Sequence, residues 1–237
     1  MGFKMNIYIG WLFKLIPLLM GIICIALGEF VLTGSGQSEY FVAGHVLISL
    51  SAICLALFTT AFIIISQLTH SMNKFYNRLF PVIGYAGSAT TMIWGWSLLA
   101  SNNVMADEFV AGHVIFGVGM IAACVSTVAA SSGHFLLIPK NASGSKSDGT
   151  PLQAYSSTIG NCLIAVPVLL TLFGFIWSVI LLRSADITPH YVAGHVLMGL
   201  TAICACLIGL VATIVHQTRN TFSVKEHRSE EHTSELQ

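Results

Sequence analysis

Charged side chains are scarce in this chain of 237 residues. Asp, Glu, Lys and Arg make up 8% of it, whereas a soluble globular domain carries about 25%. Hydrophobic residues account for 55%, and the mean hydropathy is +0.80. This composition excludes an ordinary soluble domain. We therefore predict a protein whose main partner is the lipid bilayer, with no nucleic-acid partner.

Recognisable catalytic, metal-binding and disulfide motifs are also missing. None of the six cysteines forms a CxxC pair, and all fall within apolar stretches, where cysteine commonly serves as a small packing residue. A disulfide framework or a structural zinc site is therefore not expected. The sequence shows no nucleophile–base constellation, phosphate-binding loop or pair of catalytic carboxylates. We predict that the chain is not an enzyme and assign it no cofactor.

Long apolar runs are what the chain does contain. Six of them can each supply the roughly 20 residues that cross a bilayer core. They lie near residues 7–32, 42–68, 81–100, 110–138, 156–182 and 192–217. The runs lack strand-like alternation, and backbone hydrogen bonds must be satisfied internally in lipid, so we predict helices. The expected fold is all-α, a polytopic membrane protein with six transmembrane helices.

Lysine and arginine are distributed asymmetrically between the two sides. With the N-terminus inside, Arg183 is the basic residue of the outer loops. The cytoplasmic side then holds Lys4, Lys14, Lys74, Arg78, Lys140, Lys146, Arg219 and Lys225. Cytoplasmic loops of membrane proteins carry such an excess. The pattern predicts a cytoplasmic N-terminus.

The pentapeptide VAGHV occurs three times, at Val42–Val46, Val110–Val114 and Val192–Val196. Each copy follows an aromatic residue and opens an apolar run, which indicates an internal repeat. We predict three repeated helical hairpins, near 7–68, 81–138 and 156–217, within a membrane domain 1–227. Each hairpin runs outward, turns in a short outer loop, and returns through VAGHV.

The histidines of these segments, His45, His113 and His195, are the main site candidates. An aromatic residue four positions before and a small residue four positions after each histidine share its helical face. These neighbours are Phe41, Phe109, Tyr191, Ser49, Gly117 and Gly199. Acidic candidates lie shortly upstream of the histidines: Glu39, Asp107, Glu108 and Asp186.

A second histidine layer lies near the opposite helix ends, at His70, His134 and His216. His134 and His216 each follow a VAGHV histidine by 21 residues, a rise of roughly 31 Å, which is about one hydrocarbon thickness. Helix ends tolerate histidine cheaply, so the favoured interpretation of this layer is interfacial residues with no role.

Four interpretations of the VAGHV histidines stay open. The rings can serve only in helix packing. They can sense or handle protons, because histidine changes charge between pH 5 and 8. Three imidazoles can hold zinc if they converge, so the metal is left unknown. Paired layers can also ligate haem, although no other haem signature is present. A metal-ion or small-solute transporter and a purely structural membrane protein are the alternatives at the level of function.

The last ten residues, Arg228–Gln237, read RSEEHTSELQ, an abruptly polar tail. It looks like the translation of a common sequencing-library adapter. We interpret 228–237 as a non-native read-through tail and exclude it from the reasoning on fold.

Several stretches of the chain resemble the YhiM family of enterobacterial inner-membrane proteins. They include MNIYIGWLFKLIPLLMG, SEYFVAGHVLIS, DEFVAGHVIFGVGMIAACVSTVAASSGHFLLIPK and ITPHYVAGHVL. The resemblance runs from Met5 to His227 and implies a chain truncated at its C-terminus. It implies an integral protein of the bacterial inner (plasma) membrane associated with survival at low pH. It assigns no functional residues, protein partners or oligomeric state.

Overall fold

The computed structural model describes the backbone of residues 7–33, 38–68, 74–100, 107–135, 157–184 and 187–234. Side chains are described for 10–33, 40–66, 75–100, 107–133, 158–184 and 187–216. All six elements in these ranges are α-helices. They are α1 (Ile7–Thr33), α2 (Ser38–Leu68), α3 (Lys74–Leu99), α4 (Asp107–Phe135), α5 (Ser157–Arg183) and α6 (Thr188–Ser234).

Five of the six helices are long and apolar enough to cross a membrane, α3 being the exception. The predicted all-α membrane architecture is confirmed at that level. α3 is more polar because it carries several hydroxyl side chains. Ser88 and Thr91 donate to carbonyls of their own helix, and Tyr85 shares a 2.7 Å hydrogen bond with Thr127 of α4. These bonds satisfy hydroxyl groups that would be costly to leave unpaired in lipid.

α3 begins seven residues before the start predicted from hydropathy. The apolar run predicts a helix near residues 81–100, but the helix starts at Lys74. The first turns of α3 carry aromatic residues that pack on α2. The rings of Phe80 and Phe62 stack at 4.0 Å, and Tyr76 lies 6.2 Å from Phe62. Aromatic packing against α2 therefore stabilises this segment as a helix, although hydropathy alone does not predict one there.

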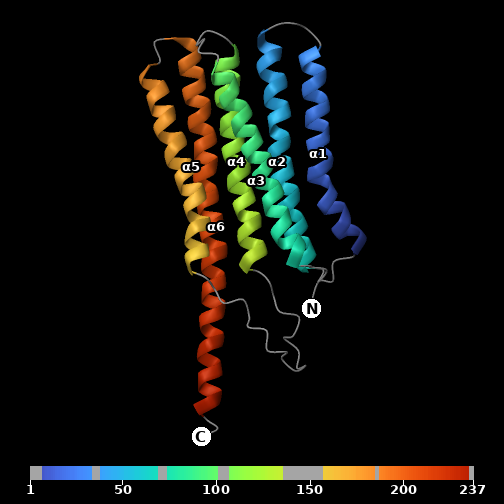
Figure 1. The fold of residues 1–237 in the computed structure, drawn as a ribbon, viewed down its shortest axis with the longest axis vertical. Helices are drawn as coiled ribbons and strands as arrows, with labels where there is room; N and C mark the ends of the chain where they lie inside the picture. The colour runs from blue at the N-terminus through green and yellow to red at the C-terminus, as the bar shows by residue number, and fades with distance from the viewer. Residues whose placement is uncertain are drawn as a thin grey trace.

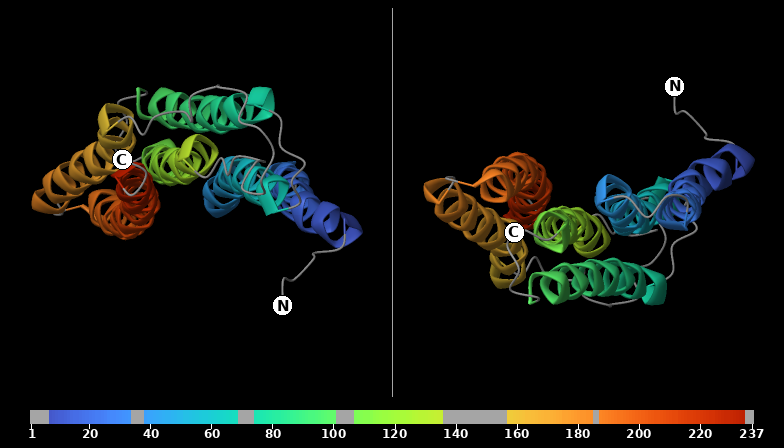
Figure 2. Two further views of the ribbon diagram at one scale, coloured as in Figure 1. Left: turned by 90° about the horizontal axis from the view of Figure 1, so that it is seen from below. Right: turned by 90° about the horizontal axis from the view of Figure 1, so that it is seen from above.

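The helices form an open row rather than a closed ring (Figure 1). α4 lies in the middle and contacts α2, α3, α5 and α6. Among the described helices α1 contacts only α2, and it reaches neither α5 nor α6. The two end-on views of Figure 2 show α1 and α5 at opposite extremes of the row. We call α1–α2, α3–α4 and α5–α6 the first, second and third hairpins.

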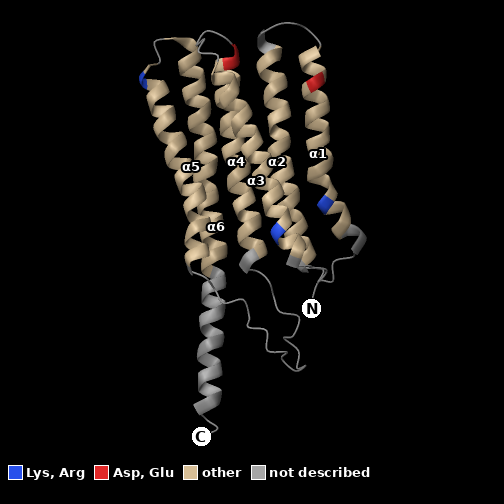
Figure 3. Ribbon diagram, in the orientation of Figure 1, with Lys and Arg blue, Asp and Glu red and all other residues tan. Residues whose placement is uncertain are grey.

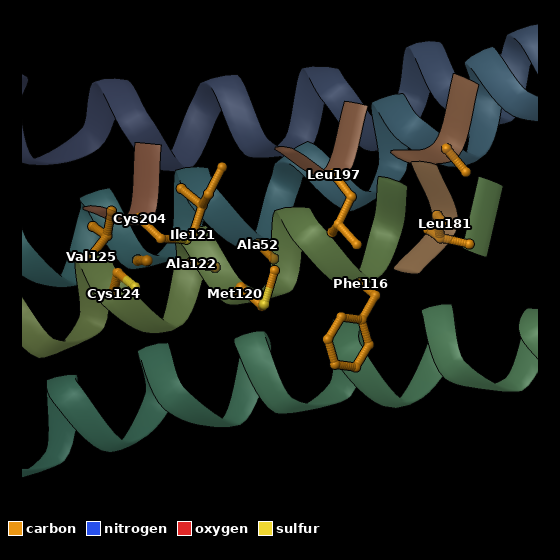
Figure 4. Close-up of a cluster of buried hydrophobic side chains, with 12 residues drawn as sticks. Ala52, Phe116, Met120, Ile121, Ala122, Cys124, Val125, Leu181, Leu197 and Cys204 are labelled. Carbon is orange, nitrogen blue, oxygen red and sulfur yellow. The ribbon is translucent and has the colours of Figure 1, made fainter. Parts of the chain in front are cut away.

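The core of the row surrounds α4, which is buried along nearly its whole apolar span, whereas α1 is mostly exposed. One buried cluster joins Met120 and Cys124 of α4 with Ala52 of α2 and with Leu197 and Cys204 of α6 (Figure 4). Outside this core, large apolar side chains face outward, as a lipid-facing surface requires.

The glycine of each VAGHV segment marks a close contact inside its hairpin. A Cβ atom placed on it would lie 2.5–2.8 Å from a leucine of the preceding helix. The pairs are Gly44 with Leu32, Gly112 with Leu99, and Gly194 with Leu182. In the first two hairpins the backbones also approach, because Gly28 faces Gly44 and Gly95 faces Gly112. Small residues permit such approaches between membrane helices.

Candidate functional site: the VAGHV histidines

The three VAGHV histidines occupy matching places in the row. His45, His113 and His195 each lie within about two turns of the start of α2, α4 and α6, respectively. These helix starts share one end of the bundle, the end at which α1 is linked to α2 (Figure 1). The histidines are therefore at one level of the molecule, on three different helices.

All three imidazoles make the same hydrogen bond to their own helix. The Nδ1 atom of His45 lies 2.8 Å from the carbonyl oxygen of Phe41. The corresponding distances are 2.7 Å from His113 to Phe109 and 2.8 Å from His195 to Tyr191. A carbonyl oxygen only accepts, so Nδ1–H is the donor and carries the proton of the neutral ring. The Nε2 atom is left to receive a second proton or another donor.

The same three aromatic residues also lie against the imidazole rings. The ring centroids are 4.1 Å apart for Phe41 and His45, 4.5 Å for Phe109 and His113, and 4.2 Å for Tyr191 and His195. This follows from the four-residue spacing, which puts both side chains on one helical face. One residue thus contributes both the carbonyl that fixes Nδ1 and a ring against the imidazole.

Indoles from the next hairpin complete two of the three sites. Trp94 of α3 lies 5.4 Å from His45, and Trp177 of α5 lies 4.9 Å from His113. Within the described chain no later helix offers a ring to His195. The sequence pattern does not single out these tryptophans, and the aromatic belts of membrane interfaces account for their places equally well. Each tryptophan stands five residues before the leucine that contacts the VAGHV glycine, Leu99 for Trp94 and Leu182 for Trp177. In the first hairpin Leu27 holds this place, five residues before Leu32.

The exposure of the histidines follows their place in the row. His113, in the central helix, is 2% exposed, His45 is half-buried, and His195 is exposed. A fourth histidine adjoins the central site. His190 of α6 lies 5.2 Å from the Phe109 ring that also contacts His113, and its Nδ1 bonds to the Ser184 carbonyl at 2.8 Å. Sequence spacing gives no sign of this neighbour.

The remaining candidates are only partly within the described residues. Asp107 and Glu108 are half-buried in the first turn of α4, where negative charge favours the helix N-terminus. His216 is exposed in the middle part of α6, which runs on to Ser234. The other four, Glu39, Asp186, His70 and His134, lie outside the residues whose side chains are described.

The structure does not bring the VAGHV histidines together around a common point. Each faces its own aromatic partners on a separate helix. Among the described side chains, no group of three His, Cys, Asp or Glu is placed to hold a metal ion. The site of three converging imidazoles that a zinc ion would need is therefore not formed by these residues.

A buried cation lies towards the opposite end of the bundle. Lys14 of α1 is 5% exposed, and its Nζ donates to the Ser66 hydroxyl oxygen of α2 at 2.9 Å. The ammonium also lies 4.9 Å from the centre of the Trp11 ring and 4.6 Å from that of Phe62. These contacts replace part of the hydration that the charge loses among apolar side chains.

Six packed helices, most of them long and apolar, with outward-facing apolar side chains, define a multi-pass helical membrane protein. The chain belongs to the family described as "Protein of unknown function (DUF2776)", whose model matches residues 5–232. It is 89% identical over 223 residues to a protein named "Inner membrane protein YhiM" from Escherichia coli (strain K12). No solved structure matches the chain.

The match to this relative covers 94% of the present chain and 64% of the relative. The chain therefore spans less than two thirds of the relative's length. The resemblance to the YhiM family is confirmed, and with it the assignment to a multi-pass inner-membrane protein.

Proposed function

We propose that this inner-membrane protein contributes to survival at low pH, and that its VAGHV histidines take up protons when the outer side is acidified. In this proposal all six helices cross the bilayer as three copies of one hairpin, with the N-terminus in the cytoplasm. The proposed role is one of sensing or handling protons and involves no catalysed reaction.

The observation that carries the proposal is the shared geometry of the three rings. In each, Nδ1–H is already engaged by a backbone carbonyl, so a proton added to the ring goes to Nε2. Histidine changes charge between pH 5 and 8, the range in which external acid would act. A proton at any of these rings places a positive charge directly against aromatic side chains.

Protonation could loosen the packing of the hairpins, or it could tighten the bundle by pairing the histidines with Glu39, Asp107, Glu108 or Asp186; the central site favours the first. A charge at His113, which is 2% exposed, would be buried between hairpins. The aromatic faces around it return about 2 kcal/mol, while burying an ion costs several kcal/mol. His190 reaches the same Phe109 ring, so a second imidazole adjoins the central site. Acid is therefore expected to loosen the packing of α4 against α5 and α6.

The charge distribution supports the proposed orientation. In Figure 3 the acidic residues lie at the end of the bundle where α1 joins α2, together with one basic residue in the last turn of α5, Arg183. Two other basic residues lie towards the opposite end, nearer the N-terminus. Positive charge is retained on the cytoplasmic side of membrane proteins, so that opposite end would face the cytoplasm. The VAGHV histidines would then lie just inside the outer surface, where external protons arrive.

The test is acid-challenge survival of a deletion strain complemented with the full-length protein. One strain carries the wild type and one a triple variant, His45→Gln with His113→Gln and His195→Gln. His216→Gln is the matched control, since this exposed histidine lies outside the VAGHV segments. Membrane abundance of every variant is measured by blot, and only variants with equal abundance are compared.

We expect the triple variant to lose rescue at normal abundance and the His216→Gln control to retain it. Of the three single variants, His113→Gln should have the largest effect because its ring is the most buried. Full rescue by the triple variant would refute the proposal and leave the histidines as packing residues.

A further inference from the structure

One face of α6 is bare although its counterparts on α2 and α4 are covered. We define the histidine stripe of an even-numbered helix as its VAGHV histidine and the residues 4, 7, 11, 14 and 18 positions later, which share one helical face. On α6 the stripe consists of His195, Gly199, Ala202, Cys206, Gly209 and Thr213. All six residues are exposed.

The corresponding stripes of the two earlier hairpins are enclosed. On α2 the half-buried His45 is followed by five buried residues, Ser49, Ala52, Ala56, Thr59 and Ile63. On α4 all six are buried: His113, Gly117, Met120, Cys124, Thr127 and Ser131. The difference between α6 and the other two helices therefore extends along the whole face.

In both enclosed cases the following hairpin supplies the cover. The stripe of α2 meets α3, with Trp94 over His45 and Gly84 beside Thr59. The stripe of α4 meets the third hairpin in the same way. Trp177 lies over His113, and a Cβ on Gly117 would lie 2.5 Å from Leu200 of α6. On α6 itself, a Cβ added to Gly199 or Gly209 meets nothing within 4 Å.

The composition of the α6 stripe is that of a helix contact rather than of a surface facing lipid. The outward faces of α1 and α5 carry large apolar side chains such as Leu19, Phe30 and Phe175. The α6 stripe instead contains two glycines, an alanine, a cysteine, a threonine and a histidine. Small residues let helix backbones approach in membranes, and polar side chains find partners across such contacts.

We infer that the α6 histidine stripe is the docking surface for a further helical hairpin of the same polypeptide in the full-length protein. The first helix of that hairpin places an aromatic ring over His195, as α3 and α5 do for His45 and His113. The relative is long enough to supply it. Since 223 matched residues are 64% of its length, about 125 of its residues lie outside the match, and each hairpin here takes about 60. This inference depends on packing and is independent of the proposed role in acid.

A second copy of the chain fits the surface less well. The first hairpin carries Leu27 where the other two carry Trp94 and Trp177, so a copy joined end to end would bring no indole to His195. Two copies joined through α6 alone would bring no indole to His195 either, because α6 contains no tryptophan.

The experiment uses a photo-crosslinking benzoyl-phenylalanine at position 199, and separately at position 206, of the full-length protein in native membranes. The same substitutions are made in the 237-residue chain. Position 176 is the matched control, because Ile176 is 58% exposed and its counterpart on α3, Ile93, is 70% exposed in mid-row. Every variant is first required to elute as a single species from detergent.

In the full-length protein, positions 199 and 206 should link within the chain to peptides from the residues outside the match. In the 237-residue chain they should yield lipid adducts, as position 176 should in both proteins. Rejection of both bulky substitutions by the full-length protein alone would also support a covered face. Crosslinked dimers, or lipid adducts at both positions of the full-length protein, would overturn the inference.

Discussion

Substitution of Gly95 by alanine tests how tightly the second hairpin is closed. The Cβ atom added to α3 would lie 2.6 Å from the backbone nitrogen of Phe116 and 2.8 Å from the carbonyl oxygen of Gly112. Both atoms belong to the backbone of α4, so no change of side-chain rotamer relieves the contact. The two helices must separate, and the packing around them must follow.

The matched control is Gly209→Ala, since nothing lies within 4 Å of a Cβ at that position of this chain. Both substitutions replace glycine with alanine inside a helix and gain about 1 kcal/mol in helix propensity. This gain cancels in the comparison. What remains is the steric cost at Gly95, for which overpacking values of about 1–3 kcal/mol apply. We expect the upper end of that range, because the obstructing atoms are backbone.

The assay is unfolding of the purified 237-residue chain by SDS in mixed micelles, followed by far-ultraviolet circular dichroism. Gly95→Ala should unfold at a clearly lower SDS fraction than Gly209→Ala, which should match or exceed the unsubstituted chain. Equal free energies of unfolding for the two variants, within about 0.5 kcal/mol, would refute the close approach of α3 and α4.

The same unfolding assay tests four further predictions. His113→Ala should cost about 2 kcal/mol, from one hydrogen bond and its aromatic contacts, while His195→Ala should cost under about 0.5 kcal/mol because its ring is exposed. The free energy of unfolding should fall between pH 7 and pH 5, since charging a buried imidazole is costly, and His113→Gln should flatten that slope; an unchanged slope would contradict the assignment. Ser66→Ala should cost about 1.5–3 kcal/mol by leaving the Lys14 ammonium without its acceptor, more than Lys14→Met, which removes the charge as well. Tyr85→Phe should cost about 1 kcal/mol, the value of one hydrogen bond between α3 and α4.

Hydropathy and repetition predicted much of the fold because both act locally. A run of about 20 apolar residues must be helical in lipid whatever its neighbours do. The predicted start of α3 was wrong because the first turns of this helix are stabilised by packing of Phe80 and Tyr76 on α2. Hydropathy along one segment contains no information about a ring on another helix.

The site was predictable only along each helix. The four-residue spacing brings Phe41 onto the face of His45, and this needs no tertiary information. The partner Trp94 comes from the next hairpin. The sequence of an apolar helix does not show how the helix is rotated about its own axis, so it does not show which neighbour such a ring meets. His113 is buried and His195 is exposed because their helices occupy different positions in the row. Three identical pentapeptides carry no information about these positions.

The open row of helices also has a consequence for biosynthesis. Among the described helices, the first and third hairpins each touch only the second. Each unit can therefore find these contacts with the neighbour inserted just before it. Closure of a ring would require contacts between the first helix and the last one. The described helices make no such contacts. The protein can therefore assemble in the order in which it is synthesised, from its N-terminus onward. A ribosome that pauses between hairpins would leave behind a partial row already packed in its native arrangement.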